Sequence, residues 1–270
     1  MNQKIFLITG GNGLIGTALC NAISKLDNTL VLSMDLQHKP IENKSIIPIV
    51  GSVMDTNFLK SVSECIKNMN GQLSGIVNCA FQPEYNAKFY TDDHFKVMPP
   101  KWKARDYRIL NEWLKCPASE LTRAFETNVV GTHNVIASQT ENLLNSDSAS
   151  IVNIGSQYGI KVPNQDLFER DDKFVYKPAA YSVSKAAVIM YTEYLASVFA
   201  GSNVRINSFS PGNIETNHTE AFKTKYAKYT WAGRMPKLEE IIEPILFLLS
   251  EKSSYMTGGH LIVDGGWTRK

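Results

Sequence analysis

Short apolar runs alternate along the chain with longer segments of helical period. The apolar runs are bounded by turn residues and have the length of buried strands. In the segments between them, apolar side chains recur three and four residues apart, as in amphipathic helices. This alternation predicts an α/β fold in which parallel strands and crossover helices form a doubly wound sheet.

The pattern predicts a single seven-stranded sheet with helices on both faces, because crossovers between parallel strands are right-handed. Strands are expected at Ile5–Thr9, Leu30–Met34, Ile46–Val50, Gly75–Cys79, Ser150–Ile154, Val204–Phe209 and His260–Val263. Helices are expected at Leu14–Lys25, Thr56–Asn68, Glu120–Asn142, Ala179–Ala200 and Leu238–Leu249. No linker-like segment divides the chain, so residues 1–270 are predicted to form one domain.

Two connections are longer than such a domain requires, at about 81–119 and 159–178. Each follows the carboxyl end of a predicted strand, where open α/β sheets bind their ligands. Because long loops in compact domains are commonly functional, both are predicted to be inserted active-site loops.

Composition narrows the classes of partner. The chain has 28 Lys+Arg and 26 Asp+Glu, a formal charge of +2, so nothing favours nucleic acid. No apolar run approaches the roughly 18 to 20 residues that cross a bilayer, and the first residues do not resemble a cleavable signal, so we expect a cytoplasmic protein without membrane contact. The four cysteines (Cys20, Cys65, Cys79 and Cys116) lack metal-ligand spacing, so we expect reduced thiols and no metal site.

A glycine-rich turn joins the first predicted strand to the first predicted helix. In such a turn Gly10 permits the tight bend, Gly13 lets a pyrophosphate approach the backbone, and Gly16 lets helix and strand pack closely. The free N–H groups of the helix N-terminus would face the anion. The sequence therefore predicts a dinucleotide site here, with Asn12, Leu14 and Ile15 completing the turn.

Asp35 ends the second predicted strand, 19 residues after Gly16. An acidic side chain at this position can accept hydrogen bonds from the adenosine ribose and would repel a 2′-phosphate, which favours NAD over NADP. Lys39 lies close enough in sequence to weaken that preference, and a solvated aspartate at a strand end is the alternative.

Tyr181 and Lys185 are four residues apart in a predicted helix, so their side chains share one face. A phenol with a pKa near 10 is a poor base at pH 7, but a neighbouring ammonium lowers the pKa of a phenol. Taken alone, such a pair would more often be an ordinary surface pair.

Several ordered motifs resemble those of the short-chain dehydrogenase/reductase family. They are the glycine turn, Asn78-Cys79-Ala80, Thr127-Asn128-Val129, Asn153-Ile154-Gly155-Ser156, the Tyr181 and Lys185 pair, Pro211-Gly212-Asn213-Ile214-Glu215-Thr216 and Val263-Asp264-Gly265-Gly266. The resemblance extends over essentially the whole chain. It implies one NAD(P)-binding Rossmann domain, a small-molecule substrate and a homodimer or homotetramer.

The resemblance also implies a mechanism. Tyr181 would exchange a proton with the substrate oxygen while hydride passes to or from the nicotinamide. Lys185 would lower the pKa of Tyr181 and hold the nicotinamide ribose, Ser156 would hydrogen-bond the reacting oxygen, and Asn128 would hold a water that links Lys185 to solvent. The further cofactor contacts that it implies are Ser52, Val53, Asn78, Ala80, Pro211, Gly212, Ile214 and Thr216.

Some positions depart from the family pattern. Cys79 and Phe81 replace an asparagine and a glycine, and Ser52 stands where an aspartate is frequent, so the adenosine contacts are expected to be altered. The glycine spacing and the 25 residues from Ser156 to Tyr181 resemble the extended branch of the family. However, only 60 residues run from Pro211 to the end, too few for a sugar-binding domain, so we assign the compact branch with inserted loops.

Basic residues cluster at 94–115, and Lys223, Lys225, Lys228 and Arg234 follow the Pro-Gly motif. They favour a polar or anionic sugar-like substrate, although a solvated surface explains them equally well. In general character the chain resembles family members of bacterial surface-glycan and flagellin-glycan pathways. A dehydratase or epimerase that recycles NAD, and a non-catalytic dinucleotide-binding regulator, are the alternatives.

Overall fold

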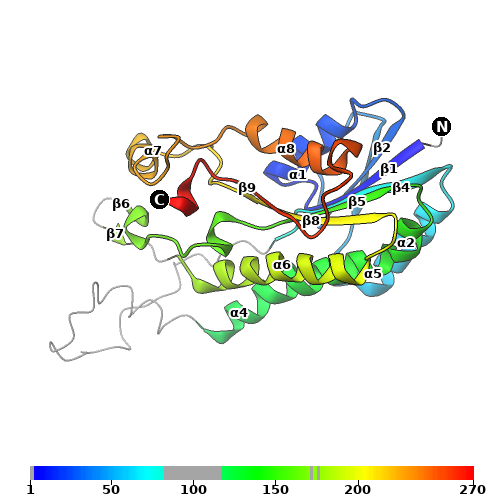
Figure 1. Ribbon diagram of the computed structural model, residues 1–270, viewed down its shortest axis with the longest axis horizontal. Coiled ribbons are helices and arrows are strands. Elements are labelled where there is room, and N and C mark those ends of the chain that lie inside the picture. The colour runs from blue at the N-terminus through cyan, green and yellow to red at the C-terminus, as the bar shows by residue number, and fades with distance from the viewer. Residues whose placement is uncertain (1–2, 82–116, 171–172, 175–176) are drawn as a thin grey trace.

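The computed structural model describes residues 3–81, 117–170, 173–174 and 177–270. Its centre is a sheet of seven parallel strands in the order β3-β2-β1-β4-β5-β8-β9 (Figure 1). The strands are β1 (Gln3–Thr9), β2 (Thr29–Asp35), β3 (Ile46–Val50), β4 (Gly71–Asn78), β5 (Ala149–Ile154), β8 (Val204–Pro211) and β9 (His260–Val263). The order reverses between β1 and β4, which creates the crevice at which doubly wound sheets bind ligands.

Helices cover both faces of the sheet. In Figure 1, α1 and α8 lie on one face, whereas α2, α4, α5 and α6 lie on the other. The helices are α1 (Leu14–Ile23), α2 (Thr56–Lys67), α4 (Ala118–Phe125), α5 (Gly131–Leu144), α6 (Ala179–Val198), α7 (Glu220–Ala227) and α8 (Glu239–Leu249). A π-helical turn, η2 (Glu126–Val130), joins α4 to α5.

Short elements gather beyond the carboxyl ends of the strands, near α7 (Figure 1). They include the 3₁₀ turns η3 (Gln157–Gly159), η4 (Gln165–Phe168) and η6 (Trp267–Arg269), and an antiparallel pair, β6 (Glu169–Arg170) with β7 (Lys173–Phe174). A further 3₁₀ turn, η5 (Glu251–Ser253), follows α8.

Alternation along the strands builds a core on each face. On β1, Ile5 and Leu7 join the cluster under α2, α5 and α6, whereas Phe6 and Ile8 join the cluster under α1 and α8. Successive strand residues point to opposite faces, so a continuous apolar run is what a sheet covered on both sides requires. A third, aromatic cluster lies apart from these two and contains Tyr158, Leu167, Phe222, Tyr226, Met235 and Trp267.

The predicted fold class and all seven predicted strands are confirmed, with small shifts at strand ends. The expected helix over Glu120–Asn142 is instead α4, η2 and α5, and α7 was not expected. The predicted loop at 81–119 lies almost entirely outside the described residues, and the one at 159–178 contains η4 and the β6–β7 pair. Among the described residues, no helix is long and apolar enough to span a bilayer.

Candidate active site

The glycine turn brings the N-terminus of α1 against the ends of β1 and β4. Gly10 has φ +66°, and a Cβ there would lie 2.8 Å from backbone atoms of Cys79 and Ala80. A Cβ on Gly16 would lie 2.1 Å from the carbonyl oxygen of Gly10. Gly13 is the N-cap residue of α1 and has no side chain to cap the helix, so N–H groups of the first turn remain for a ligand. This cradle fits a pyrophosphate, which needs close approach to backbone donors.

Asp35 stands at the end of β2, beside this cradle. Its carboxylate accepts hydrogen bonds from the backbone N–H groups of Asn12 at 3.0 Å and Leu36 at 2.7 Å. The side-chain oxygen of Asn12 accepts from the backbone N–H of Lys39 at 3.4 Å. Asn12 therefore braces the turn against the end of β2, and only Asp35 of this pair lines the cleft.

A cleft of about 670 Å³ runs over the carboxyl ends of the strands. Of the residues predicted from the sequence, it is lined by Gly10, Gly13, Leu14, Ile15, Gly16, Asp35, Ser52, Val53, Ala80, Ser156, Tyr181, Lys185, Pro211, Gly212, Ile214 and Thr216. Residues from the glycine turn and from the region of Tyr181 thus share one cavity. The predicted residues that do not line it are Asn12, Asn78 and Asn128.

Asn78 takes part in a hydrogen-bond chain inside the fold. Its amide nitrogen donates to the side-chain oxygen of Asn153 at 2.8 Å, and the amide of Asn153 donates to the hydroxyl of Thr192 at 3.0 Å. This chain ties β4 and β5 to α6. Ala80 is fixed separately, because its backbone N–H donates to the hydroxyl of Thr9 at 3.2 Å.

Tyr181 and Lys185 lie on the first turns of α6. The Lys185 ammonium is buried, donates to the carbonyl of Ile154 at 2.6 Å and lies 5.9 Å from the centroid of the Tyr181 ring. Burial lowers the pKa of Lys185 to about 8. Burial also raises the pKa of the Cys79 thiol to about 12, so that this thiol stays protonated near neutral pH. The site therefore pairs a phenol with a cation that can release its proton near neutral pH.

Asn128 contacts the start of α6 from the π-helical turn η2. Its amide nitrogen donates to the hydroxyl of Ser184 at 2.9 Å, and that hydroxyl donates to the carbonyl of Tyr181 at 3.0 Å. The carbonyl of Asn128 accepts from the hydroxyl of Thr132 at 2.8 Å. The π turn is thereby fixed against the residue that precedes Lys185, and such turns are frequent at functional sites.

Ser156 follows β5 and begins the turn η3, where its hydroxyl accepts from the backbone N–H of Tyr158 at 3.1 Å. Other residues that line the cleft were not singled out from the sequence, among them Gln157, Tyr158, Lys177 and His218. The ammonium of Lys177 lies 5.3 to 5.6 Å from the ring centroids of Tyr181, Phe168 and Tyr158. Only the adjacency of Gln157 and Tyr158 to Ser156 could have marked them in the sequence.

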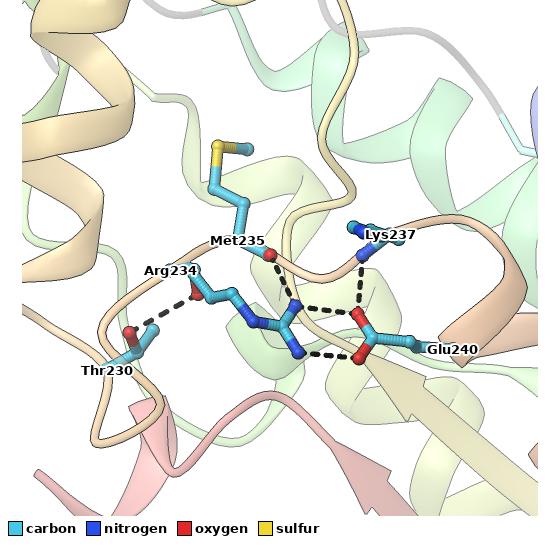
Figure 2. Close-up of polar contacts among 5 residues, drawn as sticks. All are labelled: Thr230, Arg234, Met235, Lys237 and Glu240. Carbon is cyan, nitrogen blue, oxygen red and sulfur yellow. Dashed lines mark hydrogen bonds and ion pairs between the residues drawn. The ribbon is translucent and has the colours of Figure 1, made fainter.

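The basic residues after the Pro-Gly motif do not line the cleft. The ammonium of Lys223 pairs with Glu215 at 2.7 Å and Glu220 at 3.0 Å. Arg234 forms a two-pronged ion pair with Glu240, shown in Figure 2, which anchors the start of α8. The use of Lys223, Lys225, Lys228 and Arg234 for an anionic substrate is therefore not supported, and the basic cluster at 94–115 lies outside the described residues.

Several known proteins are similar to this chain. A family model described as enoyl-(acyl carrier protein) reductase matches residues 104–268. Over 98% of both chains, the protein is 28% identical to the 3-oxoacyl-[acyl-carrier-protein] reductase of Thermotoga maritima. It is 25% identical, over 99% of both chains, to the post-translational flagellin modification protein A of Campylobacter coli.

The fold matches a crystal structure of a short-chain dehydrogenase from Leptospira borgpetersenii with bound NAD⁺. The TM-score is 0.78 at 25% identity, covering 99% of this chain and 94% of the other. The chain belongs to the short-chain dehydrogenase/reductase family, as the motifs indicated. It is an oxidoreductase that acts on an alcohol or carbonyl, and its family uses NAD(P).

Proposed function

We propose that the protein is an NAD-dependent oxidoreductase that interconverts an alcohol and a carbonyl on a polar, sugar-like substrate, with Tyr181 as the acid/base. One observation carries the proposal. Tyr181 and Ser156 line the same cleft as the glycine turn, and the buried Lys185 ammonium lies between the Ile154 carbonyl and the Tyr181 ring.

Bound NAD supplies the hydride acceptor or donor, and the protein supplies the proton chemistry. Tyr181 exchanges a proton with the substrate oxygen, while Ser156 donates a hydrogen bond that holds this oxygen. The positive charge of Lys185 stabilises the phenolate of Tyr181 and so lowers the pKa of that phenol. With its own pKa near 8, Lys185 can also pass a proton at physiological pH.

Asn128 is the positioning residue behind this pair. Its bond to Ser184 fixes the π turn beside Lys185. In our proposal this turn holds a water through which Lys185 exchanges its proton with solvent. In this arrangement Asn128 acts on the proton chemistry of the Tyr181 phenol through Lys185.

The cofactor contacts follow the cleft from end to end. Gly10, Asn12, Gly13, Leu14, Ile15 and Gly16 form the pyrophosphate turn, with Asn12 as its brace. Asp35, Ser52, Val53, Asn78 and Ala80 are assigned to the adenosine end, where Asn78 acts from behind the cleft wall. Lys185, Pro211, Gly212, Ile214 and Thr216 are assigned to the nicotinamide end. The negative charge of Asp35 at the ribose position supports NAD rather than NADP.

Two observations support a polar substrate. Hydrogen-bonding side chains, among them Ser156, Gln157 and His218, line the same cleft as Tyr181. The chain is also similar over its full length to a post-translational flagellin modification protein, and on that similarity we propose a role in flagellin or surface modification, such as glycan synthesis. The Thermotoga maritima relative is named for a 3-oxoacyl substrate. Activity on a 3-oxoacyl thioester must therefore be compared with activity on sugar-like substrates.

The proposal includes a cytoplasmic homodimer or homotetramer. Four large apolar side chains are exposed along one face of α6: Val183, Met190, Tyr194 and Val198. Their spacing of seven, four and four residues places them in one stripe, which is the pattern of a helix that packs on a second copy. A reducing cytoplasm suits the thiols Cys20, Cys65 and Cys79, which are unbridged.

A spectrophotometric screen tests the substrate class. Polyols, sugars and sugar phosphates are assayed with NAD and with NADP, beside acetoacetyl-CoA and apolar ketones in the reverse direction. We expect NADH to accumulate in proportion to product from a polyol or sugar. A preference for the thioester or for apolar ketones would refute the sugar-like substrate. If product forms without net accumulation of NADH, the reaction is a dehydration or an epimerisation and not a simple oxidation.

A further inference from the structure

Gln157 is a buried amide at the substrate end of the cleft. It follows Ser156, is 1% exposed, and lines the cavity together with Tyr181 and Gly212. Its side-chain oxygen accepts a hydrogen bond from the Tyr226 hydroxyl at 2.9 Å. No described residue accepts a hydrogen bond from its amide nitrogen.

Tyr226 fixes which end of the amide is left for a ligand. The Tyr226 hydroxyl accepts from the backbone N–H of Asn213 at 3.1 Å, so its own hydrogen is directed to the oxygen of Gln157. Burial raises the pKa of Tyr226 to about 12, which keeps this hydroxyl protonated. The oxygen of Gln157 is therefore held in place, and its two amide hydrogens remain for another acceptor.

The pair of Gln157 and Tyr226 lies against the segment assigned to the nicotinamide end. A Cβ on Gly212 would lie 3.3 Å from the Tyr226 hydroxyl and 3.4 Å from the oxygen of Gln157. On its other side, Gln157 is joined directly to Ser156. The amide thus stands between the residue that holds the reacting oxygen and the segment that braces the nicotinamide.

Buried amide donors in native proteins nearly always have a partner, because an unpaired one loses its hydrogen bonds to water without replacement. We propose that Gln157 is a substrate-recognition residue that donates its amide N–H to a second, uncharged oxygen of the substrate, near the reacting carbon. This inference rests on the proposed function, because it assumes the proposed reaction at Tyr181. It adds that the Gln157 amide is the group that selects hydroxylated substrates. Tyr226 is the positioning residue that orients the amide.

Two small carbonyl compounds test the selection, because acetoin and 2-butanone differ by one hydroxyl next to the carbonyl. We expect the wild-type protein to reduce acetoin with NADH at a kcat/KM about 10- to 100-fold above that for 2-butanone. Gln157→Met should collapse this ratio, mainly by raising the KM for acetoin. Tyr226→Phe should reduce the ratio partly.

Gln139→Met is the matched control. Gln139 is also a fully buried glutamine, but it bonds to Leu59 and Asn142 within the helical layer. Gln139→Met should lower stability and leave the ratio of kcat/KM for acetoin to that for 2-butanone unchanged. An unchanged ratio in Gln157→Met would overturn the proposal. So would a weaker affinity of that variant for NADH, which would assign the amide to the cofactor instead.

A second readout does not need turnover. In protein with ¹⁵N-labelled glutamine side chains, the Gln157 amide signal is the one that disappears in Gln157→Met. Acetoin added to the NAD⁺ complex should shift this signal, and 2-butanone should not. If neither compound shifts the Gln157 amide signal, the proposal is overturned. A shift with acetoin in a protein without NAD-linked activity on any tested substrate would refute the proposed function and support recognition by Gln157.

Discussion

The Lys185 ammonium lies 5.9 Å from the centroid of the Tyr181 ring and is held there by the carbonyl of Ile154. Only 4% of Lys185 is exposed. Its charge therefore acts on the phenol through little water, which strengthens the interaction. The same burial opposes the charge of Lys185 itself, so the arrangement that serves the chemistry costs stability.

Lys185→Met measures that cost. Below pH 8 the wild-type protein must bury a charged lysine, so we expect the variant without cofactor to gain about 2 kcal/mol in free energy of unfolding at pH 7. The pKa of Lys185 in the folded protein is about 8, below its ordinary 10.5. The penalty is thus complete below pH 8 and fades as the pH rises toward 10.5, where the advantage of the variant should shrink.

Urea denaturation of both proteins between pH 6 and 10 gives this comparison. A less stable variant at pH 7, or a difference that does not change with pH, would contradict a charged and desolvated Lys185. Turnover should be lost in the variant at every pH.

Asp35→Asn tests the preference for NAD. Asparagine keeps an oxygen for the backbone N–H of Asn12 but removes the charge that repels a 2′-phosphate. We expect the ratio of kcat/KM for NAD to that for NADP to fall by about 10-fold or more. Asp27→Asn, an equal charge change at an exposed position that does not line this cleft, should leave the ratio unchanged. If the wild-type protein and Asp35→Asn have the same ratio of kcat/KM for NAD to that for NADP, Asp35 does not determine the cofactor preference.

Gly16→Ala tests the close approach of α1 to the glycine turn. The added methyl would lie 2.1 Å from the carbonyl of Gly10, a backbone atom that cannot swing away. We expect a loss of about 1 to 3 kcal/mol in stability and a clear loss of NADH affinity, measured by fluorescence titration. Gly13→Ala, whose methyl would lie 3.2 Å from the same atom, should cost less stability. Wild-type NADH affinity in Gly16→Ala would refute the turn as the pyrophosphate site.

Met190→Arg tests the apolar stripe on α6. Met190 is 65% exposed, and a charge at its position would be buried in an interface with a second copy. Light scattering after size exclusion should show a wild-type dimer or tetramer and a smaller species for the variant. Lys60→Glu, on the exposed side of α2, should keep the wild-type mass. A wild-type monomer would show that the stripe does not serve self-association.

The sequence predicted features that depend on local pattern. The strands stood out because each is a continuous apolar run, and Tyr181 with Lys185 stood out because helical spacing fixes their relation. Helix α7 did not, because it has only two buried side chains, Phe222 and Tyr226, within a basic segment. The position of Asn78 behind the cleft wall depends on Asn153 and Thr192, which are remote in sequence, so no local pattern could show it.

The same limit explains the missed residues of the substrate end. Gln157 becomes a candidate only when Tyr226, 69 residues away, takes its oxygen. Lys177 becomes a candidate site residue only because the fold brings its ammonium close to the rings of Tyr158, Phe168 and Tyr181. Such sites form where segments that are remote in sequence meet in the fold, and the local hydrophobic pattern does not specify these contacts.

Tyr181→Phe tests the central claim most directly, because it removes one hydroxyl and keeps the ring beside Lys185. NADH binding by fluorescence titration and turnover of the best substrate from the screen are measured on the same preparations. We predict unchanged NADH affinity and a turnover reduced by at least about 100-fold. Turnover near the wild-type rate would show that another group handles the proton and would contradict the assignment of Tyr181.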